Sequence, residues 1–289
     1  MKKILAILGL AALFCSTAGA ADAPARQSTA GPGVSLLKTK LVIPGLDRQR
    51  QVRIYLPPGY ETSRKRYPVL YMHDAQNLFD NATSFAGEWK VDETLDQLAS
   101  EGKLELIVVG IDNSPDKRIN ELNPWDNPRF GAGEGRQYMD FIVKVVKPLV
   151  DHTYRTLPDR AHTAIMGSSM GGLITHFAIV QYPQVFSKAG VFSPAYWTAP
   201  MSYAYVAAKP LPKDARVYML MGGDEGDSMV PDVKVMAQTV LRTGLPKDHF
   251  VLKIVPGEHH NEGFWSTQFG EAVQWLFAPE GKKVVTAAR

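Results

Sequence analysis

The feature that most constrains the fold of this chain is a regular alternation between short apolar segments and longer amphipathic segments. Apolar runs of strand length lie at 67–74, 104–112, 161–166, 188–193, 216–221 and 250–257. Helical patterns lie at 91–102, 138–150, 170–182, 230–244 and 262–277. This alternation predicts a mostly parallel sheet covered by helices on both faces. In such a sheet, functional residues gather at the carboxyl ends of the strands.

Two details refine this expectation. The segments 36–43 and 51–57 predict paired antiparallel strands at one edge of the sheet. In the predicted helix 138–150, a period of 3.6 residues places six apolar side chains on one buried face, namely Tyr138, Phe141, Ile142, Val145, Val146 and Leu149.

The first twenty residues have the pattern of a secretory signal peptide. Lys2 and Lys3 precede an apolar run, and small residues lead to a predicted cleavage site after Ala20. The apolar run is too short to span a bilayer. We therefore expect the mature protein to be periplasmic or secreted.

The rest of the chain predicts one domain with two irregular ends. Residues 21–34 are small and rich in Pro and Gly, which is typical of a flexible leader. Residues 35–279 predict a single domain, and residues 280–289 predict a tail. No internal repeat and no second change of composition divides the chain further.

Composition and charge exclude several classes of protein. The chain has 289 residues, of which 45% are hydrophobic and 21% charged, so it can build a core and is not of disordered type. Removal of residues 1–20 removes the single cysteine, so the mature protein has no disulfide or thiolate chemistry. It also removes two lysines and lowers the formal net charge from +3 to +1. A near-neutral protein without basic clusters is a poor candidate for binding nucleic acid or an anionic membrane.

The segment AIMGSSMGGL (164–173) contains the pattern G-x-S-x-G between a predicted strand and a predicted helix. The turn is so tight that glycine is needed two residues before and two residues after the exposed serine. Only Ser169 has glycine at both positions, whereas Ser168 has methionine at both. We predict Ser169 as a nucleophile and the N–H of Met170 as a donor to an oxyanion. A glycine-rich turn with an unreactive serine is the alternative, and the strand–turn–helix context disfavours it.

A serine nucleophile needs a histidine base, which follows the last strand in the chain order Ser, acid, His. His259 and His260 follow the predicted strand 250–257. Adjacent loop residues point in different directions, so only one of the two meets Ser169. A zinc site is disfavoured, because H-E-x-x-H is absent and neighbouring histidines do not share a helix face. We therefore expect no metal and no cofactor.

The orienting acid and the second oxyanion donor also follow strand ends. The acid is expected in GGDEGD, directly after the strand RVYMLM, and Asp224, Glu225 and Asp227 all remain candidates. The second donor is expected after the strand YPVLYMHD, which leaves the backbone N–H of Ala75 or Gln76.

These segments together resemble the putative esterase family of α/β hydrolases. That family includes enterobactin esterases, feruloyl and acetyl xylan esterases, S-formylglutathione hydrolase and the mycolyltransferases. The resemblance covers residues from about 40 to 278, with its blocks at YPVLYMHDAQNLFD (67–80), FAGEWKVDETLDQL (85–98), TAIMGSSMGGL (163–173), VFSPAYW (191–197), GGDEGD (222–227) and HNEGFW (260–265). It implies an α/β-hydrolase fold, a mostly parallel central sheet with helices on both faces and antiparallel N-terminal edge strands.

The resemblance also implies roles for individual residues. It supports Ser169 as the nucleophile and selects His260 as the base. It aligns Glu225 with the acid, where many relatives have Asp, and Asp224 stays open as the alternative. Ala75 replaces a common glycine and supplies the second oxyanion N–H. The implied reaction is two-step acyl transfer through an acyl-enzyme, catalysed by a serine carboxylic-ester hydrolase without a cofactor.

Four further residues are predicted to bind the substrate. The polar segment 113–136 is too long for a simple connection and carries Arg118 and Trp125. Trp197 and Trp265 follow neighbouring strands. Aromatic surfaces with a few charges suit a small-molecule or carbohydrate ester, either an acylated or feruloylated sugar or a siderophore lactone.

Two other functions remain open at this point. An acyltransferase would form the same acyl-enzyme and pass the acyl group to a sugar. A binding module on a hydrolase fold would not catalyse a reaction, and the presence of all three triad residue types disfavours it.

Overall fold

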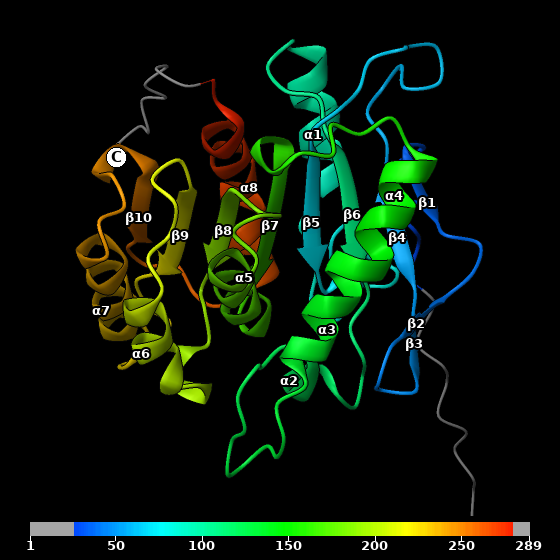
Figure 1. Ribbon diagram of the computed structural model, residues 1–289. Coiled ribbons are helices and arrows are strands. Elements are labelled where there is room, and N and C mark those ends of the chain that lie inside the picture. The colour runs from blue at the N-terminus through cyan, green and yellow to red at the C-terminus, as the bar shows by residue number, and fades with distance from the viewer. Residues whose placement is uncertain (1–25, 280–289) are drawn as a thin grey trace, which may run out of the picture.

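A single large sheet forms the centre of the protein (Figure 1). The computed structural model describes residues 26–279, so the predicted signal peptide and the predicted tail lie outside the described residues. The sheet has eight strands in the order β1-β4-β6-β5-β7-β8-β9-β10. Its strands are β1 (Val34–Leu36), β4 (Val52–Tyr55), β5 (Val69–His73), β6 (Ile107–Ile111), β7 (Thr163–Ser168), β8 (Lys188–Phe192), β9 (Arg216–Gly222) and β10 (Phe250–Val255).

Strand direction agrees with the prediction of a mostly parallel sheet. The six neighbouring strands β6, β5, β7, β8, β9 and β10 pair in parallel. In contrast, β4 pairs antiparallel with both β1 and β6. The antiparallel edge of the sheet differs in one respect from the prediction. The predicted strand 36–43 does not pair with the predicted strand 51–57 over its whole length. Only β1 pairs with β4, while β2 (Leu41–Ile43) forms a separate two-stranded sheet with β3 (Arg48–Arg50).

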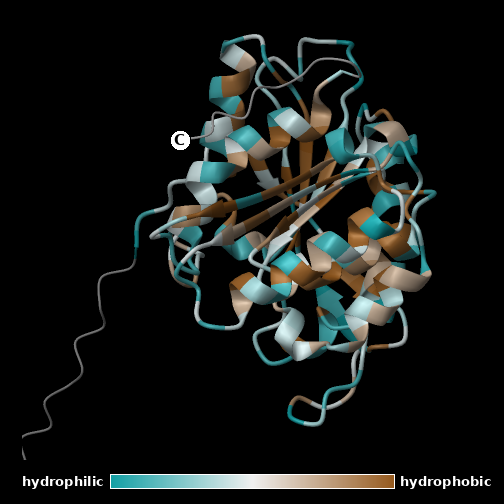
Figure 2. Cartoon of the chain, turned by 90° about the vertical axis from the view of Figure 1, so that its left-hand side faces the viewer, coloured by the Kyte–Doolittle hydropathy of each residue, from teal (hydrophilic) through white to brown (hydrophobic). Residues whose placement is uncertain are grey.

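Helices cover both faces of the sheet and enclose two apolar cores. Side chains alternate between the faces along each strand, so Tyr71 of β5 lies in one core and Met72 in the other. Figure 2 shows the hydrophobic residues concentrated along the strands and on the helix faces that meet them. The helices are α1 (Val91–Ser100) and α8 (Glu262–Phe277) on one face, and α3 (Gly135–Phe141), α4 (Lys147–Thr153), α5 (Met170–Gln181), α6 (Met201–Ala208) and α7 (Met229–Arg242) on the other, with the short α2 (Arg118–Glu121) before α3.

The helix predicted at 138–150 contains an irregularity that the sequence pattern does not reveal. α3 and α4 are joined by a π-helical segment, η2 (Ile142–Val146), which widens the turn. After Ile142 the buried positions are therefore Val146 and Val150, and Leu149 turns outward with 37% exposure. The prediction that Leu149 faces the core is wrong for this reason.

The described part of the predicted leader, residues 26–34, lies against the domain. The Ser28 hydroxyl donates to Asp80 over 3.0 Å, and the Thr29 hydroxyl donates to Glu88 over 2.7 Å. The Gly31 N–H donates to Asp92 over 2.7 Å. The structure differs here from the predicted flexible leader, because three carboxylates of the 80–92 region accept hydrogen bonds from it.

The parallel strands bring six segments of the chain to one edge of the sheet. The residues that follow their carboxyl ends are Asp74 after β5, Asn113 after β6, Ser169 after β7, Ser193 after β8, Glu225 after β9 and His260 after β10. Within residues 26–279, no helix combines the length and the apolar character needed to cross a membrane.

Candidate active site

Ser169 stands at the sharp turn between β7 and α5. Its backbone has φ 58° and ψ −121°, a strained conformation for a residue with a side chain. Its N–H donates to the carbonyl of Phe192 over 3.0 Å, which fixes the turn against β8. Ser168 is still part of β7, so the structure distinguishes the two serines as the spacing of glycines predicted.

The glycines around Ser169 are required by close backbone approach. A Cβ atom at position 167 would lie 2.9 Å from the backbone of Gly171. A Cβ atom at position 172 would lie 2.6 Å from the carbonyl oxygen of Phe192. Real side chains do not reach such distances without a shift of the backbone, so these glycines hold the serine turn in place.

His260 is hydrogen-bonded to Glu225, over 2.7 Å between Nδ1 and Oε2. The Glu225 side chain is fully buried, and the His260 side chain is 35% exposed. His259 instead lies with Nδ1 3.1 Å from the backbone carbonyl of Asp224. Of the residues left open by the sequence, His260 and Glu225 are therefore the pair that meets.

Further contacts hold this pair in its orientation. Glu225 accepts hydrogen bonds from the N–H of Gly222 over 2.8 Å and from the hydroxyl of Ser193. The Trp265 indole N–H donates to the same hydroxyl over 2.9 Å. The Trp265 ring also meets the His260 ring edge-on, with the centroids 4.9 Å apart. Trp265 thus restrains both the acid and the imidazole.

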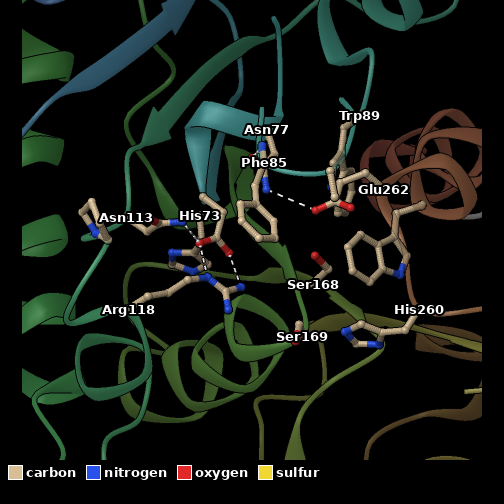
Figure 3. Close-up of a pocket in the computed structure, with 14 residues that line it drawn as sticks. His73, Asn77, Phe85, Trp89, Asn113, Arg118, Ser168, Ser169, His260 and Glu262 are labelled. Atoms are coloured by element: carbon tan, nitrogen blue, oxygen red, sulfur yellow. Dashed lines mark hydrogen bonds and ion pairs between the residues drawn. The ribbon is translucent and has the colours of Figure 1, made fainter. Parts of the chain in front are cut away.

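A cavity of about 510 Å³ opens above Ser169 (Figure 3). Figure 3 shows His260 beside Ser169, with Glu262 and Trp89 on the same side and Asn113 and Arg118 on the other. The lining residues are His73, Asp74, Asn77, Phe85, Ala86, Trp89, Asn113, Pro115, Arg118, Ser168, Ser169, His260, Glu262 and Trp265. The serine and the imidazole therefore face one solvent-accessible space that has aromatic and polar walls.

An ion pair with a buried carboxylate lies at the Arg118 side of this cavity. Arg118 donates to both carboxylate oxygens of Asp74, over 2.6 and 2.8 Å, and Asn113 donates to Asp74 over 2.6 Å. Asp74 itself has φ 57° and ψ 47°, in the left-handed region. Burial alone would raise the pKa of Asp74, but Arg118 and Asn113 outweigh it and hold the pKa below its usual value. Asp74 is therefore a fixed negative charge directly before Ala75.

Burial shifts the pKa values of two other titratable groups in the cavity, His73 and Glu262. Burial lowers the pKa of His73 to about 4, and its Nδ1 lies 2.9 Å from the Tyr138 hydroxyl. Burial, supported by the charge of Asp74, raises the pKa of Glu262 above its ordinary value. Glu262 accepts a hydrogen bond from the Asn77 amide over 3.2 Å. His73 is thus neutral at pH 7, and Glu262 is a second acidic group close to His260.

Two of the four predicted substrate-binding residues line the cavity. Arg118 and Trp265 do so, although both also make the structural contacts described above. Trp125 and Trp197 do not line it, so the cavity gives no support to the prediction for these two. The Trp125 ring packs against Phe177 with the centroids 5.7 Å apart, and Trp197 is 50% exposed.

The later part of the polar segment 113–136 packs against the turn after β8. The side-chain amides of Asn123 and Asn127 both donate to the carbonyl of Thr198, over 3.3 and 2.7 Å. These bonds hold the segment against the turn after β8. Only its first part, which includes Arg118, stays at the cavity.

The predicted oxyanion donors lie where the strand ends predicted them. Met170 is the first residue of α5, and Ala75 follows Asp74 at the start of a short 3₁₀ turn, η1 (Ala75–Asn77). Within residues 26–279, neither N–H donates a hydrogen bond to another part of the protein. A Cβ atom on Gly110 of β6 would come within 2.7 Å of the Ala75 methyl, so this glycine makes room for the alanine.

Several cavity residues were not singled out from the sequence. Asp74 is the last residue of the predicted strand 67–74 and Asn113 directly follows the predicted strand 104–112, so their position at a strand end was an available signal. Glu262 lies in the first turn of α8, two residues after His260. Phe85 and Trp89 reach the cavity from an irregular loop, and no periodic pattern marks them. Among the described residues, no group of three or more His, Cys, Asp or Glu side chains is arranged to hold a metal ion.

A serine at a tight strand–helix turn, with a buried carboxylate and an imidazole after later strands of the same sheet, defines the class as an α/β hydrolase. The sequence matches the family described as putative esterase over residues 43–276. The protein is also 30% identical over 242 residues to the uncharacterized protein YbbA of Bacillus subtilis. The match covers 79% of this chain and 92% of that protein. The chain therefore belongs to the putative esterase family.

Two further relatives extend the comparison. The chain is 25% identical over 150 residues to an endo-1,4-beta-xylanase/feruloyl esterase of Xylanibacter ruminicola; the match covers 50% of this chain and only 20% of that longer protein. The enterobactin esterase FES from Shigella flexneri, solved in the presence of enterobactin, has the same fold with a TM-score of 0.70 and 17% identity. That match covers 86% of this chain and 60% of the other.

Proposed function

We propose that this carboxylic-ester hydrolase is a serine esterase with Ser169, His260 and Glu225 as its catalytic triad. The observation that carries the proposal is the 2.7 Å hydrogen bond between His260 Nδ1 and Glu225, in a cavity that His260 shares with Ser169. With Nδ1 bound to the carboxylate, Nε2 is the ring nitrogen left to accept a proton, as a base for serine requires.

The proposed reaction has two steps. Ser169 Oγ attacks the ester carbonyl carbon while His260 Nε2 takes the hydroxyl proton, and the N–H groups of Met170 and Ala75 stabilise the oxyanion. The bond to the alcohol oxygen then breaks, and that oxygen takes the proton from His260. Water attacks the acyl group on Ser169 with His260 again as base, and the free acid leaves.

The substrate that we propose is an acylated or feruloylated sugar, or a siderophore lactone. Aromatic side chains on the cavity wall, namely Phe85, Trp89 and Trp265, support an ester that carries a flat ring. Two relatives are named for such reactions, as a feruloyl esterase and as an enterobactin esterase.

We also propose that residues 1–20 direct the chain out of the cytoplasm. The support is the basic start, the apolar run and the small residues that precede position 21. Fractionation of expressing cells, with sequencing of the new N-terminus, tests this. Retention of residues 1–20 in a cytoplasmic product would contradict it.

An activity panel tests the function. Purified protein should hydrolyse p-nitrophenyl acetate and at least one of methyl ferulate, an acetylated sugar and a siderophore trilactone, and Ser169→Ala should abolish the activity. Product analysis with a sugar acceptor separates the alternatives. Free acid supports hydrolysis, whereas an ester transferred to the sugar would support an acyltransferase. A folded protein that is inactive on all of these esters would support a binding module.

A further inference from the structure

A second hollow lies next to the active-site cavity and has a different character. It has a volume of about 680 Å³ and is bounded by the 81–90 loop, the start of α8 and Thr29. We call it the polar groove. Its lining residues are Thr29, Asn81, Ala86, Gly87, Glu88, Lys90, Asn261, Gly263 and Ser266. Apart from Ala86 and the two glycines, every one of these side chains is polar or charged.

The polar groove adjoins the cavity across Ala86, which is exposed. Ala86 lines both spaces. Asn261 and Gly263 line the groove, while Glu262 between them lines the cavity. Phe85 stands at this junction with 91% exposure, and its N–H donates to Asn77 over 3.0 Å. A ligand that fills the cavity can therefore extend into the groove past an exposed aromatic ring.

The chemistry of the proposed reaction decides which part of the ester lies on this side. His260 must give its proton to the oxygen of the leaving alcohol, so that alcohol has to lie on the His260 side of Ser169. The chain that follows His260 directly supplies Asn261 and Gly263 to the groove. Figure 3 shows Glu262 on this same side, away from Arg118. The acyl group is then left to the side of Asn113 and Arg118.

The polarity of the groove decides what kind of alcohol it suits. Glu88 is only 9% exposed and accepts from the Thr29 hydroxyl through one oxygen, which leaves acceptor capacity on a preorganised carboxylate. Lys90 is exposed, and Asn81 carries a side-chain amide that can donate. Such a surface offers hydrogen-bond partners to an alcohol with many hydroxyl groups, whereas an alkyl alcohol makes no hydrogen bonds with it. The exposed Phe85 ring adds a flat apolar face against which a sugar ring can stack.

From these observations we propose that the polar groove binds the alcohol part of the ester and that this alcohol is rich in hydroxyl groups, as a glycoside is. The inference rests on the proposed serine esterase function. In the step concerned, the bond between the acyl carbon and the alcohol oxygen breaks, and the oxygen keeps the electron pair. It takes the proton held on His260 Nε2, and the neutral alcohol leaves along the groove.

The test compares two substrates that share an acyl group, acetylated xylobiose and ethyl acetate. Ser266→Trp fills the groove from α8, and Thr267→Trp is its matched control, since Thr267 is exposed and lines neither space. We expect wild-type kcat/KM to be at least about tenfold higher for the sugar ester, and Ser266→Trp to remove most of that preference through KM. Thr267→Trp should keep it.

Each other result overturns the inference in a recognisable way. Equal losses on both substrates in Ser266→Trp, or equal effects of the two Trp variants, would assign the position a structural role only. A wild-type enzyme that hydrolyses ethyl acetate without preferring the sugar ester would refute the groove while leaving the serine esterase function intact. A wild-type enzyme that hydrolyses neither of these esters nor any ester of the activity panel would refute the function itself, and the groove inference with it.

Discussion

Nδ1 of His260 and Oε2 of Glu225 lie 2.7 Å apart, and the carboxylate belongs to a fully buried side chain. The carboxylate also accepts from Gly222 N–H and from Ser193, so these hydrogen bonds fix its orientation toward His260. A carboxylate held in this way keeps the proton of a neutral imidazole on Nδ1. The neighbouring Asp224 contacts the histidine pair only through its backbone carbonyl, to His259.

Glu225→Gln should therefore lower kcat by about 10²- to 10⁴-fold with a small change in KM, because the amide no longer stabilises the imidazolium. Asp224→Asn is the matched control and should retain kcat within about threefold, since its side chain does not meet His260. Steady-state kinetics on p-nitrophenyl acetate measure both. A greater loss in Asp224→Asn than in Glu225→Gln would reverse the assignment of the acid.

Ser169→Ala should remove nearly all turnover, while Ser168→Ala should stay active. Only Ser169 occupies the strained position of the turn, with φ 58° and ψ −121°. Ser168 lies one residue earlier in β7 and lines the same cavity, so it tests the geometry of the turn rather than mere proximity. Rates on a p-nitrophenyl ester and labelling by a serine-reactive phosphonate provide the measurement. An inactive Ser168→Ala variant together with an active Ser169→Ala variant would contradict the assignment of Ser169 as the nucleophile.

Much of this arrangement could be predicted from the sequence, because the signals are local. Buried parallel strands are short apolar runs, and the tight serine turn demands its glycines. A strand end also puts the residue that follows it at the functional edge of the sheet. Ser169, His260 and Glu225 all lie in segments that such rules mark, and the structure brings the last two into contact.

The parts that could not be predicted depend on how loops fold against distant residues. Trp125, Trp197 and Trp265 were all predicted to bind the substrate, yet only Trp265 lines the cavity, and two Asn side chains hold the region around Trp125 against Thr198. Phe85 lies in a loop without periodicity. The outward turn of Leu149 comes from a π-helical segment, whose hydrogen bonding leaves no mark on hydrophobic periodicity.

The Asp74–Arg118 pair should act on catalysis rather than on binding. Asp74 is held in a left-handed conformation that costs on the order of 1 kcal/mol, and its contacts to Arg118 and Asn113 offset this cost. Because Ala75 follows directly, loss of the pair should misplace the proposed oxyanion N–H. Asp74→Asn should lower kcat by about tenfold to a hundredfold with little change in KM, and Arg118→Lys should do so less. An effect confined to KM or to thermal stability would show that the pair does not position the donor.

Phe85 and Trp197 offer a matched comparison of two exposed aromatic residues. Phe85 lines the cavity and Trp197 does not, although the sequence had favoured Trp197. Phe85→Ala should raise KM for acetylated xylobiose by roughly threefold to tenfold, the range expected for a lost aromatic contact. Trp197→Ala should leave KM unchanged. Equal effects in the two variants would restore the predicted role of Trp197 in substrate binding.

Two buried histidines should make the fold sensitive to acid. Burial lowers the pKa of both His73 and His176 from 6.5 to about 4, and Nε2 of each has no partner within the described residues. Between pH 6.5 and about 4 the unfolded chain takes up protons that the folded chain does not, so stability is lost as pH falls through this window.

His176→Gln isolates one of these two contributions. His176 lies on α5, with Nδ1 2.7 Å from the Tyr196 hydroxyl, and it does not line the cavity. The neutral amide retains a hydrogen-bonding group for Tyr196 but does not titrate. Urea unfolding at several pH values between 4.5 and 7.5 should therefore show a shallower fall in the free energy of unfolding, by up to about 1.4 kcal/mol per pH unit. A slope equal to that of the wild type would mean that His176 titrates alike in both states, whatever the variant does to stability at neutral pH.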